Sequence, residues 1–276
     1  MKFSVLMSVY YKENPQYLQE SLDSLINQTL KPNEIVIVKD GELTAELDDL
    51  IAKYVEEHSK LFKIIEFEKN RGLGIALREG VLVCSNELIA RLDSDDIALT
   101  DRFERQVRYM EQNPDVDMVG GFSLEFQNNI GNIIAIRTAP ESDQDIKNYA
   151  RKRNPFNHTT VMYRKTAVLK SGNYEDFLWN EDYYLWVRMI INACKFYNLQ
   201  TGLSYFRANY EMFERRGGLK YAMLDIKLQR EFLKLSFINY REYISNVVSR
   251  VMIRLMPNQI RRYIYVNFLR GKGESI

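Results

Sequence analysis

Three aspartates within four positions stand out in this 276-residue sequence, because Asp93, Asp95 and Asp96 directly follow a short, mainly apolar run at residues 88–92. Carboxylates repel one another and resist burial unless a cation or hydrogen-bond donors compensate them. In an open α/β sheet, ligands bind at the carboxyl ends of the strands. The pattern therefore predicts a seat for a divalent metal that carries phosphates. The alternative is a solvated, Asp-rich turn that caps the next helix.

The elements that must position these aspartates can be predicted from the pattern of apolar residues. Runs at residues 3–9 and 34–38 lack polar alternation, as is typical of parallel strands covered on both faces, and a third strand is expected at about 63–67. Apolar residues at helical spacing predict helices between the strands, the first of them starting at Asn14 and Pro15. With residues 88–92 as the fourth strand, the order β-α-β-α-β-α-β predicts a parallel, doubly wound sheet.

Polar residues at three predicted strand ends should meet at one edge of this sheet. Ser8 and Tyr10 end the first strand, Asp40 ends the second, and the three aspartates end the fourth. Together these residues predict a nucleotide site. They would supply a ring that can stack, an acid that can accept a hydrogen bond from a base, and carboxylates that can bind a metal. No G-x-G-x-x-G follows the first strand and no Walker P-loop is present, so the site is of neither kind.

Five segments carry a resemblance to a known family. They are residues 4–10 (SVLMSVY), 21–29 (SLDSLINQT), 35–41 (IVIVKDG), 70–76 (NRGLGIA) and 91–96 (RLDSDD). In this order and spacing they resemble the family 2 glycosyltransferases with the GT-A fold, and within them the bacterial capsule and exopolysaccharide branch that includes the amylovoran glycosyltransferases. The resemblance extends to about residue 215, and it is specific for fold and reaction type but not for the sugar.

The resemblance implies which residues bind the nucleotide part of the donor. Tyr10 would lie near the uracil, and Asp40 would accept a hydrogen bond from the uracil N3–H. The full set of donor-binding residues implied in this half of the chain is Ser8, Tyr10, Asp40, Arg71, Gly72 and Asp93. One departure is Lys39, where many family members carry a second acid before Asp-Gly; Asp40 still holds the position next to glycine.

The resemblance also implies a metal. Asp93 and Asp95 match the D-x-D pair of the family, and Asp96 is the adjacent acid. Carboxylate and phosphate oxygens suit the hard cations Mg²⁺ and Mn²⁺. Which of the three aspartates ligates the metal directly stays open.

A second acidic pair, Glu181 and Asp182, begins a predicted helix. Acids in a first helical turn complement the macrodipole, but a carboxylate in a cleft can also deprotonate a hydroxyl group as general base. The family resemblance assigns Asp182 as the base and Glu181 to a supporting role. Trp179 either stacks on a sugar face or fills the core. His158 either lies near the donor pyrophosphate or the acceptor, or is a hydrogen-bonded structural group.

The second half of the chain is expected to hold the acceptor. A helix capped by Thr100 should run to about Gln112, and apolar runs at 118–126 and 133–136 around residues 128–132 predict a β-hairpin. Residues 206–218 resemble the mobile lid of the family, in which Arg215 and Arg216 either clamp phosphates or form a solvated basic turn. Where many relatives carry a further histidine ligand, this chain has Asn209.

The C-terminal part is basic, with a formal charge of +5 from residue 237 onward against −4 for the remainder. Apolar residues at helical spacing between 240 and 255, with Arg241, Arg250 and Arg254 beside them, continue after Pro257. This pattern predicts either a helix packed on the catalytic domain or a dimer partner, or an interfacial helix on anionic lipid.

Composition limits the remaining possibilities. Hydrophobic residues make up 46% and charged residues 27%, which is typical of a folded soluble protein, and a net charge of +1 argues against nucleic acid as a partner. The two cysteines are far apart, which suits a reducing compartment, and the N-terminal apolar run is too short for a signal peptide. We expect a cytoplasmic protein. If the basic C-terminal helix lies on anionic lipid, the protein would also contact the cytoplasmic face of a membrane peripherally.

Together these features predict an α/β protein of the GT-A type, in which a mostly parallel, Rossmann-like sheet is followed by a mixed acceptor-side sheet and a C-terminal helical tail. The expected domains are 1–218 (1–105 for the nucleotide-sugar half, 106–218 for the acceptor half) and 219–276. The expected activity is inverting, metal-dependent transfer of a sugar from a nucleotide-diphospho-sugar, which we expect to be UDP-linked. The acceptor is expected to be a glycan or a lipid-diphosphate-linked glycan in surface polysaccharide synthesis.

Two other functions remain as alternatives. A sugar-1-phosphate nucleotidyltransferase would share the sheet, but it should carry a Gly-rich basic loop after the first strand, where this chain has Tyr10, Tyr11, Lys12 and Glu13. A non-catalytic nucleotide-sugar-binding protein would tolerate the loss of Asp182.

Overall fold

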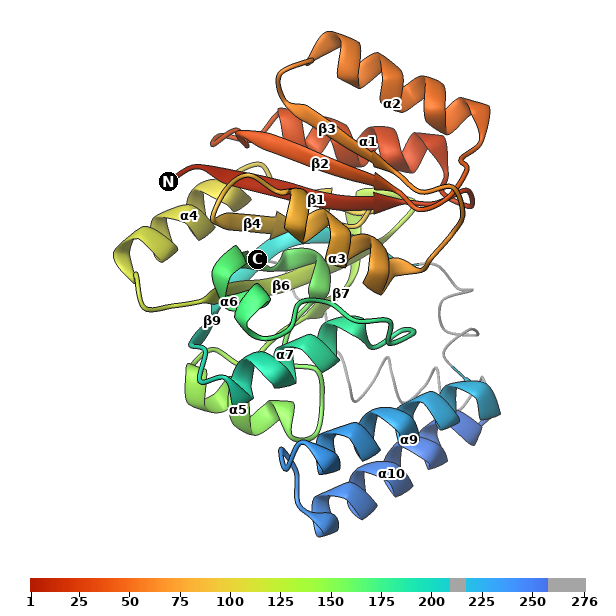
Figure 1. Cartoon of the computed structure of the whole chain (residues 1–276), viewed down its shortest axis with the longest axis vertical. Coiled ribbons are helices and arrows are strands. Elements are labelled where there is room, and N and C mark those ends of the chain that lie inside the picture. Colours follow the sequence, from red (N-terminus) through yellow and green to blue (C-terminus); the bar gives the residue numbers. More distant parts are fainter. Residues whose placement is uncertain (209–216, 258–276) are drawn as a thin grey trace.

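The computed structural model describes residues 1–208 and 217–257 (Figure 1). Its first half is the predicted alternation of strands and helices. The elements are β1 (Phe3–Val9), α1 (Pro15–Ile26), β2 (Glu34–Lys39), α2 (Ala45–Glu57), β3 (Phe62–Glu66), α3 (Leu73–Val83) and β4 (Leu88–Arg91). The four strands are parallel in the order β3-β2-β1-β4, which confirms the predicted parallel sheet.

The second half extends this sheet with mixed strand directions. Its elements are β5 (Ile97–Ala98), α4 (Arg102–Gln112), β6 (Met118–Gln127), β7 (Asn129–Arg137), α5 (Asp143–Ala150), the 3₁₀ turn η1 (His158–Thr160), β8 (Met162–Arg164), α6 (Lys165–Lys170), α7 (Glu181–Ile191) and β9 (Phe196–Arg207). Beyond β4 the order continues β8-β6-β9-β5, with β7 paired to β6. β8 runs antiparallel to β4, so it joins the two halves into one sheet.

Two boundaries differ from the sequence prediction. The hairpin of β6 and β7 turns on a single residue, Asn128, whose φ of 64° lies in the left-handed region that asparagine tolerates, so both strands are longer than the apolar pattern suggested. The helix after the aspartates starts one residue later than expected. Asp101, not Thr100, occupies its N-cap position and makes no side-chain capping bond there.

Alternate residues of the parallel strands face two separate apolar layers. Val5 and Met7 of β1 pack with α1, α2 and α4 on one face of the sheet. Leu6 packs with α3, α6 and α7 on the opposite face. Because both faces are covered, the strands carry no polar alternation, which is what made them recognisable in the sequence. The first helix starts as predicted, with the side chain of Asn14 accepting a hydrogen bond from the Gln16 N–H at 2.8 Å and Pro15 in the first turn.

Close packing joins the nucleotide half to the helix that carries the second acidic pair. Gly74, in the first turn of α3, leaves so little space that a Cβ there would lie 2.2 Å from the Glu175 carbonyl oxygen and 3.2 Å from the Glu181 Cβ. Any larger residue would force the two segments apart. The start of α7 is therefore held next to the strand ends by a contact that only glycine allows.

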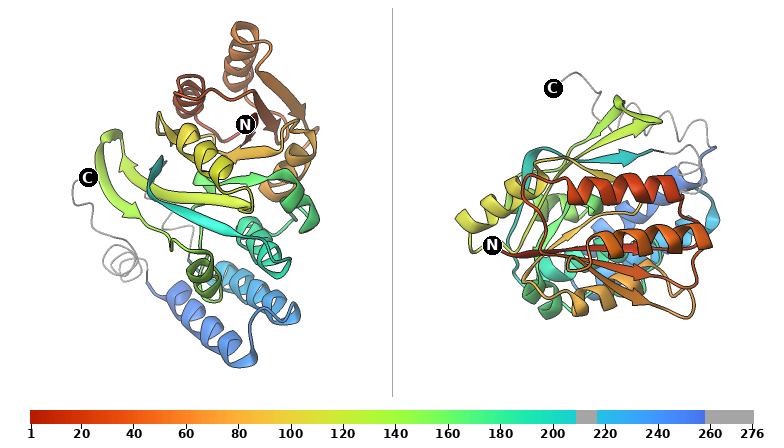
Figure 2. Two further views of the ribbon diagram at one scale, coloured as in Figure 1. Left: turned by 90° about the vertical axis from the view of Figure 1, so that its left-hand side faces the viewer. Right: turned by 90° about the horizontal axis from the view of Figure 1, so that it is seen from above.

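Two further helices, α9 (Leu219–Lys234) and α10 (Tyr240–Leu255), pack together beside α5 and α7 (Figure 2). A third apolar cluster fills this contact, with Phe177, Tyr183 and Val187 from the catalytic side and Leu228 and Phe232 from α9. α10 begins with a capping box between Asn239 and Glu242. Within residues 1–208 and 217–257, no helix is long and apolar enough to cross a membrane.

Buried charge also fixes the two helices to each other. Asp225 of α9 is 1% exposed and accepts hydrogen bonds from Arg250 at 3.1 Å and from Arg254 at 2.7 Å, both on α10. Arg250 also donates to the Lys152 carbonyl at 2.8 Å, beyond the end of α5. Since breaking a buried ion pair leaves an uncompensated charge, this network holds α10 in one orientation.

Candidate active site

Four carboxylates gather where β4 ends. Asp93, Asp95 and Asp96 form the turn after the strand, and Glu13 reaches them from the loop between β1 and α1 by accepting a hydrogen bond from the Ser94 hydroxyl. We call these four residues the acid cluster. Arg91, which is 1% exposed, forms an ion pair with Asp93. The strand thus delivers both the acids and a buried cation to the edge of the sheet.

The acid cluster is short of positive charge. Burial, reinforced by the charges of Asp93 and Glu13, raises the pKa of Asp95 to about 7. Burial together with Asp95 and Asp93 raises the pKa of Asp96 well above its usual value, and burial also raises the pKa of Glu13. Asp96 is fully buried, and its Oδ2 has no hydrogen-bond partner among the described residues. Such a set of oxygens is suited to a divalent cation.

The side chains as they lie do not converge on one point. Within the described parts of the chain, no group of three or more His, Cys, Asp or Glu side chains is arranged to hold a metal ion. Asp93 turns to Arg91, and Asp96 accepts a hydrogen bond from the backbone N–H of Arg207 at 3.1 Å. The carboxylate of Asp95 makes neither contact.

Arg207, the last residue of β9, supports the acid cluster from behind. Its Nε donates to the Asp95 carbonyl at 3.1 Å and its Nη2 to Glu20 at 2.5 Å, while its guanidinium lies over the Tyr17 ring. This arginine belongs to the predicted lid segment, but it is buried in a structural role and is not available to clamp phosphates. Arg215 and Arg216, which the sequence assigned to the donor, lie outside the described residues, as does Asn209.

The predicted donor residues lie at the ends of β1 and β2. Asp40 is buried, and its two carboxylate oxygens accept hydrogen bonds from the backbone N–H groups of Arg71 at 2.7 Å and Gly72 at 3.0 Å. Gly72 has a φ of 87°, a conformation that favours glycine, and a Cβ there would meet no atom within 4 Å. Asp40 therefore fixes the 70–72 loop at the strand end and leaves open space in front of it.

The other donor residues of this half frame the same edge. Ser8 is half-buried in β1, opposite Val38 of β2. Tyr10 follows the strand with an exposed ring, which meets Tyr11 edge to face. Lys39, which departs from the family pattern, is held by ion pairs to Asp48 and Glu66. The exposed Tyr10 ring is free to stack on a planar ligand.

The second acidic pair lies at the start of α7. Asp182 is half-buried, and its Oδ2 accepts a hydrogen bond from the Asn154 side chain at 2.6 Å while its Oδ1 accepts from the Tyr183 N–H at 2.6 Å. Burial raises the pKa of Asp182, and burial and the charge of Asp182 raise the pKa of Glu181 to about 8. At neutral pH Glu181, with its pKa of about 8, is the member of the pair that holds a proton.

The acid cluster and the acidic pair form one electrostatic unit. The charge of Arg91 lowers the pKa values of both Glu181 and Asp182, and the charge of Asp93 acts on Glu181 in the opposite sense. Such interactions require the groups to be near one another in a weakly screened region. The structure thus brings the predicted metal residues and the predicted base close enough for the charge of Arg91 to act on both.

His158 and Trp186 lie beneath this site rather than in it. The His158 Nε2 shares a hydrogen bond with the Tyr174 hydroxyl at 3.1 Å, and its ring meets the fully buried Trp186 edge to face. Burial, with the charge of Arg91, lowers the pKa of His158, so the imidazole is neutral. These contacts favour the structural alternative for His158 and place Trp186 in the core.

Trp179 stands just before the acidic pair with an exposed ring. Its φ of 64° is uncommon for a bulky residue, and its ring stacks on Tyr221 of α9 with centroids 4.7 Å apart. Such a conformation costs free energy and persists only where surrounding contacts hold it. The stack therefore fixes one face of the indole and links the α7 entry loop to the C-terminal helices.

Four supporting residues were missed by the sequence prediction. The sequence contains a signal for Arg91 and Glu13. An arginine inside an apolar strand must find a buried partner, and Glu13 follows a strand end. Arg207 and Asn154 contact acids that are distant in the sequence, at Asp95 and Asp182 respectively. No local pattern marks such contacts.

We expect the stability of the metal-free protein to fall as the pH rises from about 5 to about 8. The folded-state pKa of Glu181, about 8, lies above its unfolded value of 4.5. The stabilisation from its bound proton is therefore complete below the unfolded pKa and is lost as the pH rises through the folded pKa, by at least about 1 kcal/mol or ~2–4 °C in Tm. Thermal unfolding in EDTA across this pH range measures it.

The matched variant for this experiment is Glu181→Gln, which cannot ionise. Its Tm should vary less than that of the wild type between the same pH values. Parallel Tm curves for the two proteins would contradict the raised pKa of Glu181.

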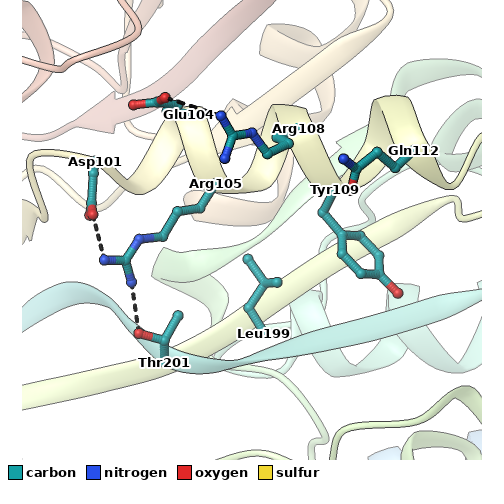
Figure 3. A pocket seen from close by; sticks show the side chains of 8 residues that line it. All are labelled: Asp101, Glu104, Arg105, Arg108, Tyr109, Gln112, Leu199 and Thr201. Carbon is teal, nitrogen blue, oxygen red and sulfur yellow. Dashed lines mark hydrogen bonds and ion pairs between the residues drawn. The ribbon is translucent and has the colours of Figure 1, made fainter.

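Two cavities lie away from this site. One, of about 400 Å³, is lined by residues of α4 and β9 and contains the bonds of Arg105 to Asp101 and to the Thr201 hydroxyl (Figure 3). Another, of about 900 Å³, lies between α1, β5 and the β6–β7 hairpin. Neither is lined by the acid cluster or by Asp182, so we do not assign the chemistry to them.

Comparison with known proteins identifies sequences that resemble this chain over nearly its whole length. The model of glycosyl transferase family 2 matches residues 4–177. A UDP-Gal:alpha-D-GlcNAc-diphosphoundecaprenol beta-1,3-galactosyltransferase from Escherichia coli is 38% identical over 98% of this chain and 97% of its own length. The amylovoran biosynthesis glycosyltransferase AmsE from Erwinia amylovora is 36% identical over 98% of this chain and 100% of its own. The resemblance inferred from the sequence is confirmed.

Two solved structures share the fold. S. aureus TarS 1-349 in complex with UDP-GlcNAc superposes with a TM-score of 0.65 at 18% identity, covering 92% of this chain and 72% of that one. The mannosyltransferase PcManGT from Pyrobaculum calidifontis, in complex with GDP-Man and Mn²⁺, gives 0.63 at 14% identity, covering 91% and 69%. These likenesses confirm the predicted GT-A fold.

Proposed function

The chain belongs to glycosyl transferase family 2, and from this we propose that it is an inverting, metal-dependent transferase that moves a sugar from a UDP-linked donor to a hydroxyl group of a lipid-diphosphate-linked glycan. The observation that carries the proposal is the pairing of an acid cluster at the end of β4 with the half-buried Asp182 across the buried Arg91. The same site could thus bind a charged diphosphate through a metal and supply a base for the acceptor hydroxyl.

The donor side is set by the ends of the first, second and fourth strands. Tyr10 would stack on the base, and the 70–72 loop held by Asp40 would contact the nucleoside. Asp93 and Asp95 would hold Mg²⁺ or Mn²⁺, with Asp96 as a further acid. When bound, the metal offsets the negative charge that develops on the departing diphosphate. UDP is favoured as the nucleotide because the relative from E. coli is named for UDP-Gal and the TarS structure contains UDP-GlcNAc.

Asp182 would act on the acceptor. Its carboxylate takes the proton of the acceptor hydroxyl as the oxygen forms a bond to the anomeric carbon. The bond from that carbon to the diphosphate oxygen breaks, and its electron pair leaves with UDP. Attack from the side opposite the leaving group inverts the configuration. Asn154 orients the carboxylate through its hydrogen bond at 2.6 Å, and the protonated Glu181 limits repulsion beside it.

The acceptor side lies toward the second half of the chain. The exposed ring of Trp179, three residues before Asp182, is placed to stack on a sugar. A lipid-diphosphate-linked acceptor is proposed because the E. coli relative is named for a GlcNAc-diphosphoundecaprenol acceptor and AmsE for amylovoran biosynthesis. Such an acceptor places the reaction at the cytoplasmic surface of a membrane, in surface polysaccharide assembly.

The test is transfer by the purified protein. UDP- and GDP-linked sugars are offered with Mn²⁺ to a short-chain GlcNAc-diphosphate-lipid analogue, and both nucleotide release and the anomeric configuration of the product are measured. We expect release of UDP only in the presence of a divalent cation, and a β-linked product from an α-linked donor. Retention of configuration would refute the inverting mechanism. Pyrophosphate-dependent formation of UTP would identify a nucleotidyltransferase, and donor binding without turnover a binding protein.

A further inference from the structure

The outward face of α10 is apolar along its whole length. Tyr240, Ile244, Val248, Met252 and Leu255 are each between 46% and 66% exposed. Their spacings of four, four, four and three residues place them on one side of the helix. We call these five residues the outer stripe. A contiguous exposed apolar surface of this kind on a globular protein indicates a contact with something other than water.

Three polar residues of α10 face the protein instead. Asn246 donates to the Gln229 side chain and to the Arg151 carbonyl, both at 2.8 Å. Arg250 and Arg254 bind the buried Asp225, as described above. These three side chains thus bind inward, while the outer stripe lies on the exposed side of the helix. This also changes the interpretation of the sequence, since these two arginines hold the helix on the protein and do not face a lipid surface.

The two C-terminal helices also carry exposed basic residues, which are Lys220, Lys227, Arg230 and Lys234 on α9 and Arg241 on α10. Lys220 and Lys227 lie over the Trp179 and Phe177 rings, and Lys234 forms an ion pair with Glu231. The start of α9 meets the end of α10 through a hydrogen bond from the Gly218 N–H to the Arg254 carbonyl at 2.9 Å, so the two helices run in opposite directions. From residue 219 to residue 255 the two helices carry seven basic residues and three acids, a net formal charge of +4, which is complementary to an anionic surface.

One end of the outer stripe lies toward the loop that precedes Asp182. Leu255 ends α10 where α9 begins, and Tyr221 in the first turn of α9 carries the ring on which Trp179 stacks. Leu219 and Met223 of the same stretch of α9 are also exposed. Exposed apolar side chains thus continue from α10 to the start of α9, where Tyr221 contacts Trp179 in the loop before Asp182.

From these contacts we infer that the outer stripe is the surface by which the protein docks on a lipid bilayer with anionic headgroups. The apolar side chains enter the boundary between headgroups and acyl chains, and the basic residues around them contact the headgroups. The inference rests on the proposed function, because a surface-docked enzyme meets a lipid-diphosphate-linked acceptor with its sugar near Trp179 and Asp182.

The test compares two substitutions on adjacent residues of the full-length protein. Val248→Glu places a charge in the outer stripe, and Ser249→Glu places the same charge on the flank of the same exposed turn. Val248 is 49% exposed, and Ser249→Glu removes only the hydrogen bond from the Ser249 hydroxyl to the Asn246 carbonyl at 3.1 Å. Near-identical Tm values establish that both variants fold. Binding to vesicles of phosphatidylcholine, with and without phosphatidylglycerol, is measured by co-sedimentation in the absence of donor and acceptor.

We expect the wild type to bind the anionic vesicles and Val248→Glu to bind at least about tenfold more weakly, with Ser249→Glu close to the wild type. Transfer to the short-chain acceptor analogue without vesicles should be equal in all three proteins. Equal lipid binding by the two variants would overturn the inference. So would a stable dimer that Val248→Glu dissociates, or lipid binding that appears only when residues 258–276 are deleted.

The two proposals fail in different ways. If the wild type binds vesicles but transfers no sugar, the docking surface stands and the proposed activity is wrong. If it transfers sugar to the analogue but binds no vesicles, the activity stands and the docking surface is wrong.

Discussion

Replacing Asp182 by Asn is expected to lower kcat by about 10²–10⁴-fold, the contribution of a positioned general base, while donor binding stays near the wild-type level. The amide has nearly the shape of the carboxylate but cannot take the proton of the acceptor hydroxyl. It can still accept one of the two hydrogen bonds that Asp182 receives from Asn154 and Tyr183, so the entry to α7 should keep its conformation. Steady-state transfer to the acceptor analogue and calorimetric binding of UDP measure the two quantities separately.

The control for this variant is Asp176→Asn, in the same loop before α7, where the side chain is exposed. It should transfer sugar at the wild-type rate. If Asp182→Asn retained more than about a tenth of the wild-type kcat, where loss of a base should cost at least 10²-fold, the base would have to be another residue. Glu181→Gln would then be the next variant to measure, since Glu181 is the neighbouring acid.

Replacing Asp95 by Asn is expected to lower transfer by at least about 10²-fold, because the diphosphate loses the charge stabilisation of its metal. Unlike the loss of the base, this change should also remove the part of UDP binding that depends on Mn²⁺. At the same time the metal-free protein should become more stable, because the substitution removes a buried carboxylate that faces Asp93 and Glu13. Activity, Mn²⁺-dependent UDP binding and Tm in EDTA are the three measurements.

The matched control is Asp49→Asn, which changes the same formal charge on the exposed side of α2. It should leave activity and metal dependence unchanged. Wild-type Mn²⁺ dependence in Asp95→Asn would refute the assignment of Asp95 as a ligand. A fall in the Tm of the metal-free variant would contradict the view that the acid cluster lacks compensating charge.

The sequence was sufficient for the fold of the first half because each element there satisfies a local rule. Residues 3–9 and 34–38 are predicted as strands buried on both sides, and the structure places both as inner strands of the sheet. Asn14 and Pro15 start a helix through their own chemistry. The convergence of Tyr10, Asp40 and the aspartates at one edge then follows from parallel strand direction alone.

What the sequence could not provide depends on contacts between distant residues. Arg207 carries no local pattern that marks its role, and only the strand order that brings β9 to β5 shows that it supports the turn after β4. The arginines of α10 read as a basic face for the same reason. Their partner Asp225 lies on another helix, 25 and 29 positions away in the chain.

The stack of Trp179 on Tyr221 bears on how the C-terminal helices of this chain could be exchanged for those of a relative. Tyr221 lies under the guanidinium of Arg254, 4.2 Å from the ring centroid, and Arg254 binds Asp225, so the loop before Asp182 is continuous with both C-terminal helices. Recombination at residue 218 would join a foreign helical pair to a tryptophan whose left-handed backbone it does not support. We therefore expect hybrids that keep Trp179, Tyr221 and Arg254 from one parent to retain more activity than hybrids that divide them.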